Sequence, residues 1–303
     1  MLKEQEINLI ALVERFHDED KCRIYLEKLR WPEGIRCSRC GSDKISRIMT
    51  RNQLDCDSCR YRFSITAGTI FHDSHLPLWK WFVAVYLIVE SKKGISANQL
   101  RRTLGTTYRT AWHLSHRVRA AFKEVDAQLL KGIVEADETF VGGKVEGMGR
   151  GYTDNKVVVV RAIERGGTIR LQVVKGGDRE TLQGFIRENV AGETQAIYTD
   201  ELPSYLGIAD HDTEHKTVNH SEKEYVRGDV HVNSVENIWS LLKRSIIGSY
   251  HQVSAKHLDA YLDELEFRFN NRENPHMFRD AMYKLLVANN LPYAKLIAQE
   301  EAK

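Results

Sequence analysis

The sequence predicts a mixed α/β domain that follows a small four-cysteine module and a short helical region. Three observations support this prediction: two C-x2-C pairs, a basic stretch of helical periodicity from Ser91 to Lys123, and β-branched, strand-like runs after Gly132. A chain of 303 residues has room for one large domain and one or two small ones. We expect an N-terminal helical segment at 1–30, followed by the cysteine module at 31–70. The helical region is expected at 71–125, and the α/β domain with its C-terminal helices at 130–303.

The two cysteine pairs predict a structural zinc site. Cys37 and Cys40 form the first pair, Cys56 and Cys59 form the second, and 15 residues separate the pairs. Each C-x2-C turn can point two thiolates at one Zn²⁺ ion, and four sulfur ligands leave no open position for water. The alternative is a set of unpaired buried cysteines. Cys22 lies outside the pattern and is predicted to be an ordinary small core residue.

The basic stretch predicts two helices that contact DNA. From Ser91 to Lys123 the chain has eight basic residues and no acidic one. Ser96 is a suitable N-cap for a helix over 97–104 that ends at Gly105, and Thr106 or Thr107 is a suitable cap for a helix over 108–122. This order is typical of a helix-turn-helix motif, although a plain helical hairpin with a solvated basic face is the alternative. The arginines predicted to contact DNA are Arg101, Arg102, Arg109, Arg117 and Arg119.

The α/β domain is predicted from a change in periodicity. Runs rich in β-branched residues predict strands at 133–141, 157–163, 169–174, 195–199 and 216–218. Asp178 can cap a helix between the third and fourth strands, and the apolar spacing from Val235 to Ile246 predicts another helix after the fifth. This element order implies a mixed sheet. Two last helices, over 254–269 and 280–288, are expected to pack on this layer or on each other.

Three carboxylates in this domain suggest a site for divalent cations. Asp137 lies in the middle of the first strand, Asp200 ends the fourth, and Glu236 lies in the first turn of the amphipathic helix. A carboxylate among apolar neighbours is costly to bury unless a cation pairs with it. Mg²⁺ and Mn²⁺ prefer such oxygen ligands. Two such ions about 4 Å apart can activate a nucleophile and stabilise the leaving oxygen of a phosphodiester.

Each carboxylate also has a purely structural alternative. Asp200 could be an N-cap for the segment that follows it. Asn233 and Glu236 have the spacing of a capping box, so Glu236 could only stabilise the start of its helix.

The first strand offers more than one acidic candidate. Asp137 could be a sheet-edge or salt-bridge residue, and Glu135 and Glu138 compete with it for the role of ligand. Residue alternation places Glu135 on the same strand face as Asp137 and turns Glu138 to the opposite face.

Longer sequence phrases accompany these residues. They are Glu-Ala-Asp-Glu-Thr-Phe-Val-Gly-Gly from Glu135, Tyr-Thr-Asp ending at Asp200, the block from His231 through Gly248, and its continuation through His251-Gln-Val-Ser and Arg268-Phe-Asn-Asn-Arg. With the cysteine ribbon, these phrases make the chain from about Cys37 through Arg272 resemble an insertion-sequence DDE transposase of the group with an N-terminal zinc ribbon. The 35 residues between Asp200 and Glu236 match the D-x(35)-E interval common in such enzymes.

The resemblance implies an RNase H-like catalytic core in which Asp137, Asp200 and Glu236 are the acidic ligands of Mg²⁺ or Mn²⁺. Some relatives replace the third acid with Asn or His, so Asn233 is the neighbour to consider beside Glu236. Lys243 lies two helical turns after Glu236, and in the family a lysine at that offset follows the acid. Lys243 is therefore expected to meet a DNA phosphate, with a solvated lysine as the alternative.

The implied activity is metal-dependent cleavage of double-stranded DNA at the inverted repeats of an insertion sequence, followed by transfer of the freed strand to target DNA. Two ends must be joined, so a dimer or larger assembly on DNA is expected. One alternative is a zinc-ribbon and helix-turn-helix regulator whose RNase H-like domain is inactive. A second is a structure-selective nuclease that cleaves without strand transfer.

Composition leaves the partner open and argues against a membrane protein. The chain has 44 basic and 42 acidic residues, so its net charge of +2 predicts no partner. The N-terminus carries charges at positions 3, 4 and 6, and the most apolar run, 81–89, is too short to cross a bilayer. Five cysteines do not form a secreted disulfide framework, and we expect a cytoplasmic protein.

Overall fold

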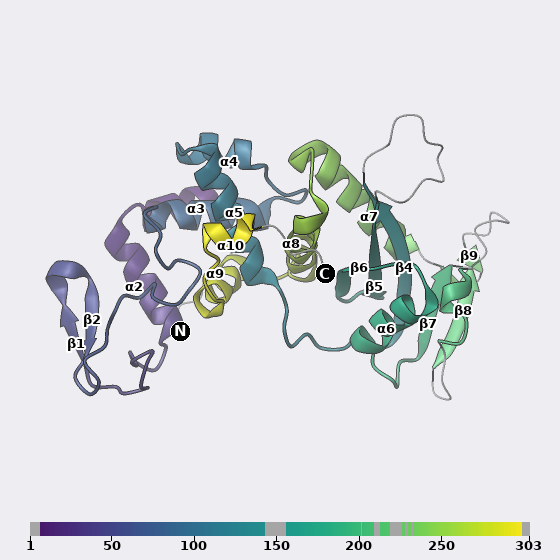
Figure 1. Ribbon diagram of the computed structural model, residues 1–303, viewed down its shortest axis with the longest axis horizontal. Coiled ribbons are helices and arrows are strands. Elements are labelled where there is room, and N and C mark those ends of the chain that lie inside the picture. Colours follow the sequence, from purple (N-terminus) through teal and green to yellow (C-terminus); the bar gives the residue numbers. More distant parts are fainter. Residues whose placement is uncertain are drawn as a thin grey trace. The chain divides into compact units, whose positions relative to one another are not determined.

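The computed structural model describes residues 7–142, 156–200, 202–208, 213–218, 226–227, 230–231 and 233–298 (Figure 1). The chain divides into two compact units. The first combines Met1–Lys123 with Glu273–Lys303, and the second is Glu124–Arg272. The segment after Arg272 thus belongs with the N-terminal half, whereas the sequence predicts that it is part of the α/β domain.

The four-cysteine module is a three-stranded antiparallel ribbon in the order β1-β2-β3. Its strands are β1 (Ile45–Ile48), β2 (Gln53–Cys56) and β3 (Arg62–Phe63), with a short 3₁₀ turn, η1 (Met49–Arg51), between the first two. The fully packed core of this module is small, with Cys37, Leu54, Cys56 and Phe63 at its centre and partly buried apolar residues around them. Because so little apolar surface is buried, the ribbon depends on its cysteines for stability.

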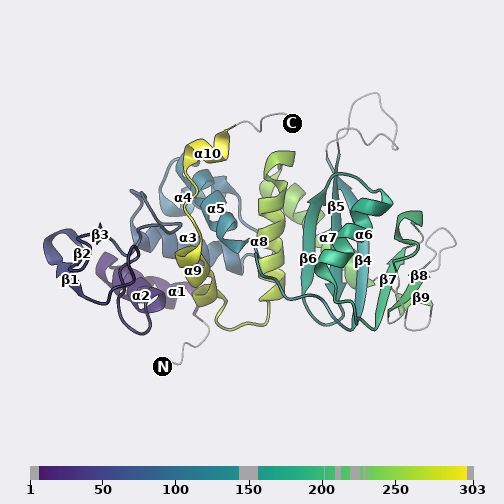
Figure 2. The same cartoon turned by 60° about the horizontal axis from the view of Figure 1, so that its bottom comes forward.

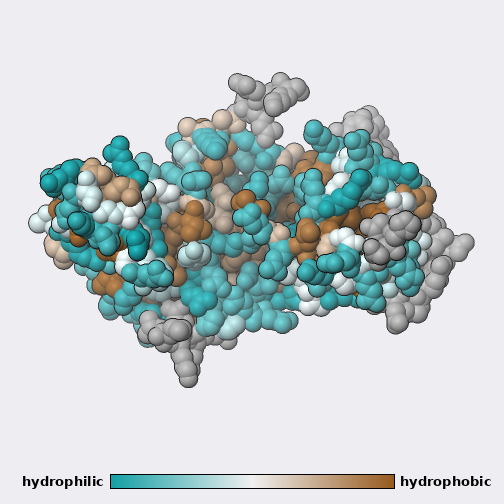
Figure 3. All heavy atoms as spheres, turned by 90° about the horizontal axis from the view of Figure 1, so that it is seen from below, coloured by the Kyte–Doolittle hydropathy of each residue, from teal (hydrophilic) through white to brown (hydrophobic). Residues whose placement is uncertain are grey.

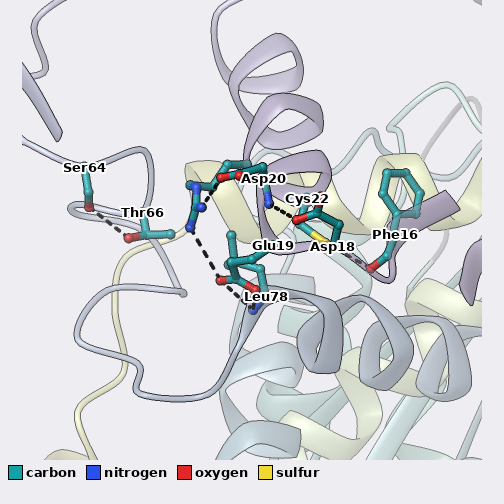
Figure 4. A network of polar contacts seen from close by, with 9 residues as sticks. Phe16, Asp18, Glu19, Asp20, Cys22, Ser64, Thr66 and Leu78 are labelled. Carbon is teal, nitrogen blue, oxygen red and sulfur yellow. Dashed lines mark hydrogen bonds and ion pairs between the residues drawn. The ribbon is translucent and has the colours of Figure 1, made fainter. Parts of the chain in front are cut away.

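Helices form the rest of the first unit. They are α1 (Leu9–Phe16), α2 (Glu19–Arg30), α3 (Leu78–Glu90), α4 (Ala97–Leu104), α5 (Tyr108–Phe122), α9 (Met277–Val287) and α10 (Tyr293–Ile297). Figure 4 shows the polar contacts that set the start of α2 and α3: Asp18 accepts from the backbone N–H of Asp20, and Glu19 accepts from that of Leu78. Cys22 is fully buried in this region, which confirms its predicted core role.

Helix α9 explains why the C-terminal segment joins this unit. Its apolar face is buried, and its Phe278 ring lies 5.9 Å from the Phe82 ring of α3. The carbonyl of Leu285 also accepts a 3.1 Å hydrogen bond from the backbone N–H of Ile70. Helical periodicity revealed the apolar face of α9, but the partner of that face lies about 200 positions earlier in the chain and has no local signal.

Helices α4 and α5 have the predicted boundaries. The Ser96 side chain accepts from the backbone N–H of Gln99, and Gly105 ends α4 in the left-handed region at φ 60°. Thr107, rather than Thr106, caps α5 by accepting from the N–H of Thr110. The caps and the glycine stop therefore confirm two helices joined by a three-residue turn.

The second unit contains a five-stranded mixed sheet, shown with its helices in Figure 2. The strands are β4 (Ile133–Val141), β5 (Val157–Glu164), β6 (Ile169–Val174), β7 (Ala196–Asp200) and β8 (Glu214–Val218), in the spatial order β6-β5-β4-β7-β8. Strand β5 is antiparallel to both neighbours, whereas β7 is parallel to β4 and to β8. This 3-2-1-4-5 order with an antiparallel second strand is an RNase H-like sheet and confirms the expected fold.

Helices cover both faces of this sheet. Helix α6 (Arg179–Asn189) packs with Val158, Val160 and Ala162 on one face. Helices α7 (Asn233–Ser245) and α8 (Leu258–Asn270) pack with Val159 and Ile163 on the other. The alternation along β5 thus divides the core into two layers. The remaining described strands, β9 (Val226–Arg227) and β10 (Val230–His231), form a separate two-stranded pair.

Among the described residues, no helix is both long and apolar enough to cross a membrane. The face drawn in Figure 3 is mostly hydrophilic, with separate hydrophobic patches.

Candidate functional site

The four predicted zinc ligands lie together in the ribbon. The Sγ atoms of Cys37, Cys40, Cys56 and Cys59 all lie within 4.8 Å of one another. The Cys37–Cys59 and Cys40–Cys56 Sγ distances are 3.7 and 3.6 Å. In a tetrahedral thiolate site with Zn–S bonds of about 2.3 Å, neighbouring sulfur atoms are about 3.8 Å apart. The sulfur geometry therefore fits one closed, structural Zn²⁺ site.

The ribbon thiols differ in how readily they ionise. Burial opposes ionisation of Cys37, but hydrogen bonds from the backbone N–H groups of Cys40 and Arg39, and from the Cys40 and Cys59 thiols, outweigh it and lower the pKa of Cys37 to about 7. The N–H of Arg39 lies 3.4 Å from the Cys37 sulfur, a contact that follows from the tight C-x2-C turn. The Ser42 N–H lowers the pKa of Cys40, but burial and the Cys56 and Cys37 thiols raise it overall, and burial raises the pKa of Cys59 to about 12.

The carboxylate cluster lies where the central parallel strands separate. Strands β4 and β7 pair from Ile133 and Ala196 through Glu135 and Tyr198, and no pairing between them follows. Asp137 and Asp200 come two residues after that last pair; Asp200 ends β7, whereas β4 continues past Asp137 to Val141, paired only with β5. Carboxylate oxygens of Asp137, Glu138 and Asp200 lie within 4.8 Å of one another, and all three residues are half-buried.

Asp137 is held by contacts on both of its oxygens. The indole N–H of Trp239, in α7, donates to Oδ2 at 2.6 Å, and the backbone N–H of Glu138 donates to Oδ1 at 2.9 Å. The Arg161 guanidinium, on the adjacent position of β5, lies 3.7 Å from the same Oδ2. Burial raises the pKa of Asp137, while the Arg161 charge and the Trp239 hydrogen bond oppose that increase, and the nearby Asp200 charge adds to it.

Glu138 is the cluster residue that strand alternation predicts to face away from Asp137. Its Oε2 accepts a 2.9 Å hydrogen bond from the hydroxyl of Tyr205, a fully buried residue in the α6-side core. The expected opposite face is therefore correct, but the carboxylate still reaches the cluster because β7 no longer covers this part of β4. Burial, followed by the negative charge of Asp200, raises the pKa of Glu138 to about 7.

Glu135, the other competitor on β4, has a structural partner. Its side chain is fully buried, and its Oε1 accepts a 2.8 Å hydrogen bond from Arg165 Nε in a salt bridge. Among the three acids of this strand, the geometry thus favours Asp137 and Glu138 for a cation site.

Helix α7 carries the remaining predicted acid. Glu236 and its alternative, Asn233, lie in the first turn of α7, but their side chains fall outside the part of the chain that the structure describes. Lys243 is exposed in the last turn of the same helix. The assignments of Glu236 and Lys243 therefore stay predictions. Trp239, three residues after Glu236, connects this helix to Asp137 and was missed by the sequence analysis, which treated it only as an apolar position.

The basic helices divide into exposed and buried arginines. Arg101, Arg102 and Arg109 are exposed on α4 and α5. Arg117 and Arg119 are only 5% and 2% exposed. Arg117 donates to the carbonyl oxygens of Ile70 and His72, so it supports the loop before α3 rather than facing solvent. Of the five predicted arginines, the three exposed ones therefore stay candidates for contact with DNA phosphates.

Two family models match the sequence. The model described as an ISXO2-like transposase domain matches residues 129–270, and the model described as a transposase zinc-ribbon domain matches residues 17–62. The first match covers the mixed sheet with α6, α7 and α8, and the second covers α2 and most of the cysteine ribbon.

Two curated proteins are also similar. A protein in transposable element ISH50 of Halobacterium salinarum is 28% identical over 277 residues, which cover 84% of this chain and 92% of that protein. A transposase-like protein of Haemophilus influenzae is 32% identical over 101 residues, covering 33% of this chain and 80% of that protein.

Two solved structures show partial similarity. A pre-cleavage Mos1 transpososome has 13% identity and a TM-score of 0.28, with 67% of this chain and 74% of that chain covered. A simian T-cell lymphotropic virus intasome in complex with the PP2A regulatory subunit B56 gamma has 15% identity and a TM-score of 0.23, with 69% and 75% covered.

Proposed function

The chain belongs to the ISXO2-like transposases with a zinc ribbon, and from this membership we propose that it cleaves DNA at the ends of an insertion sequence and transfers the freed strand to target DNA. The observation that carries the proposal is the cluster of Asp137, Glu138 and Asp200 where β4 and β7 separate. Within the described residues, this cluster combines three carboxylates with access to solvent, as a phosphodiester substrate requires.

The donor set fits Mg²⁺ or Mn²⁺. All three groups offer hard oxygen ligands, and their spacing within 4.8 Å allows shared coordination. When bound, such ions activate the attacking water or 3′-hydroxyl and stabilise the leaving oxygen of the phosphodiester. Asp137 and Asp200 supply the negative charge that holds the cation, and Glu236 is the proposed third ligand from α7. Lys243, exposed on the same helix, would bind a phosphate of the DNA.

The first unit supplies the proposed contacts to the element ends. Its exposed basic residues on α4 and α5 are suited to the phosphate backbone of double-stranded DNA. The zinc ribbon stabilises this unit through a closed metal site with no position for a substrate. Because two element ends must be joined, the proposed active form is a dimer or larger assembly on DNA.

The test is an assay on labelled DNA carrying an element end, with purified protein and Mg²⁺ or Mn²⁺. We expect both cleaved strands and strands joined to a second DNA. Cleavage without joined products would support a structure-selective nuclease, and tight site-specific binding without metal-dependent cleavage would support a regulator with an inactive α/β domain. The end substrate is obtained from the DNA that flanks the reading frame, where short inverted repeats are expected on both sides.

A further inference from the structure

Trp239 contacts the carboxylate cluster from outside the proposed ligand set. It lies in the middle of α7, its ring is 7% exposed, and it packs in the core between this helix and the sheet. The indole N–H is nevertheless directed at Oδ2 of Asp137, at 2.6 Å.

Arg161 completes this contact from the other side. Its guanidinium carbon lies 4.1 Å from the centroid of the Trp239 ring, within the range of a cation–π interaction. Arg161 is fully buried, and its Nη2 is 3.7 Å from the same Asp137 oxygen. The Trp239 ring thus both covers the arginine and donates to the oxygen that the arginine faces.

The contacts of Asp137 leave limited room for a cation. A carboxylate has about four lone-pair sites. One on each oxygen is engaged by the N–H groups of Trp239 and Glu138, so the free lone pairs have a fixed direction. Asp200 and Glu138 place their own carboxylate oxygens within 4.8 Å of Asp137, so a cation bound there needs Asp137 in this orientation.

We propose that Trp239 is a positioning residue for the divalent-cation site, which orients the Asp137 carboxylate and keeps it from forming a closer ion pair with Arg161. This inference rests on the proposed function, because it takes Asp137 as a cation ligand. It also links α7 to the site directly. Trp239 is one helical turn after Glu236, so the same contact fixes the helix that carries the proposed third ligand relative to β4.

The distance between Asp137 and Arg161 indicates how loss of the Trp239 N–H would change cation binding. Without the indole N–H, Oδ2 of Asp137 has no short donor and can move toward Arg161 Nη2, now 3.7 Å away. A closer ion pair competes with a cation for the same oxygen. Removal of such supporting hydrogen bonds costs about 10- to 100-fold in metal affinity in other sites.

The experiment measures Mn²⁺ binding to the full chain without DNA, by titration followed with electron paramagnetic resonance. Trp239→Phe keeps an aromatic ring over Arg161 but removes the N–H donor. We expect its Kd for Mn²⁺ to rise about tenfold. Trp79→Phe, a matched change at a partly exposed tryptophan of the other unit, should leave the Kd unchanged. An unchanged Kd in a folded Trp239→Phe variant would overturn the inference.

A second replacement separates the hydrogen bond from packing. Benzothienylalanine at position 239 has the shape of tryptophan, with sulfur in place of the ring N–H, so it preserves the core even if phenylalanine leaves a cavity. Its Kd for Mn²⁺ should rise like that of Trp239→Phe, and a wild-type Kd would show a packing role only. In the cleavage assay, added Mn²⁺ should restore activity to both variants, whereas it should not restore activity to Asp137→Asn.

The Asp137→Asn variant also separates the two hypotheses. If Mn²⁺ binding in the wild-type chain is abolished in Asp137→Asn but unchanged in Trp239→Phe, the cation site stands and the positioning role fails. If Mn²⁺ binding does not depend on Asp137 at all, the proposed function itself fails.

Discussion

The two candidate metal centres of this protein differ in how the chain forms them. In the ribbon, four thiols lie within 23 residues, and each C-x2-C pair is held by one tight turn. In the α/β unit, Asp137 and Asp200 lie 63 positions apart and meet only because β4 and β7 are parallel neighbours in register. The first centre is closed by four sulfur ligands and is structural, whereas the second has half-buried oxygens and can accept a substrate. Two tight turns joined by a small ribbon thus form the first centre, whereas the second depends on the complete sheet.

The largest effect is expected at the carboxylate centre. Asp137→Asn and Asp200→Asn should each abolish strand cleavage, because asparagine keeps the shape of aspartate but removes the charge that holds a divalent ion. DNA binding and folding should change little. The measurement is cleavage of a labelled end substrate in Mg²⁺ or Mn²⁺ beside a binding gel at the same protein concentration.

The matched control for these variants is Asp126→Asn, at an exposed position of the same unit, which should cleave normally. Full cleavage by the Asp137 or Asp200 variant would contradict the proposed mechanism. Loss of cleavage together with loss of folding would instead indicate a structural role for the altered aspartate.

Replacing a zinc ligand of the ribbon should instead disrupt the folding of the ribbon. Cys37→Ser or Cys59→Ser should release the zinc, about one ion per chain, and unfold the ribbon, because its buried core is too small to fold alone. The α/β unit should keep its own thermal transition. Zinc content by atomic absorption and calorimetric unfolding test both parts, and Cys22→Ala, at the buried cysteine outside the cluster, should keep its zinc. Purified wild-type protein without zinc would refute the ribbon site.

The difference between local and long-range contacts also explains which features the sequence could predict and which it could not. The Ser96 cap and the Gly105 stop were predictable because each depends on contacts within a few residues, and the zinc ligands were predictable from the spacing of the two C-x2-C pairs. The mixed sheet followed from the order of the strands along the chain, and the RNase H-like fold from the resemblance, whereas the spatial order of the strands came from the structure. The reach of Glu138 into the cluster did not, because alternation predicts only the strand face from which a side chain starts, whereas its carboxylate lies beside Asp200 and Tyr205, which come from distant parts of the chain.

The burial of residues with long-range partners was equally hidden. Arg117 lies in a stretch that looks uniformly basic, but its partners are carbonyl oxygens more than 40 positions away. Trp239 followed the apolar period of its helix, and nothing local indicated that its N–H would meet Asp137. A periodic pattern shows which face of a helix is buried, but the polar partners on that face depend on the tertiary structure.

The effect expected at the third acid depends on the role of that residue, and it tests whether the carboxylate centre takes its third ligand from α7 or from β4. Glu138→Gln and Glu236→Gln each remove one charge. If Glu236 is a ligand, its variant should lose cleavage, whereas in a capping-box role glutamine would serve as well and activity would survive. We expect Glu138→Gln to reduce cleavage about tenfold, since Tyr205 still orients the side chain while the cation loses one charged neighbour.

The cleavage assay with both variants distinguishes these roles. Full cleavage by Glu236→Gln with a strong defect in Glu138→Gln would move the third carboxylate to β4. Full cleavage by both would direct attention to Asn233, in the first turn of α7.

The smallest effect is expected on helices α4 and α5, where exposed and buried arginines occur in one stretch of 19 residues, from Arg101 to Arg119. Replacing Arg101, Arg102 and Arg109 with Ala should weaken binding to element ends and reduce the slope of log affinity against log salt by roughly 0.9 for each phosphate that is no longer neutralised. Folding should be unaffected because these side chains are exposed. Binding titrations at several salt concentrations provide the measurement, and an unchanged slope would indicate an ordinary solvated face.

Arg117→Ala and Arg119→Ala are the matched comparison, because they come from the same basic helix but are buried. Arg117 holds the carbonyl oxygens of Ile70 and His72, so its removal leaves buried acceptors without a donor and should lower the free energy of unfolding by about 1–3 kcal/mol. The salt slope of the folded fraction should stay at the wild-type value. A reduced slope with wild-type stability would reverse this assignment and show that Arg117 reaches DNA after all, through a rearrangement of the loop before α3.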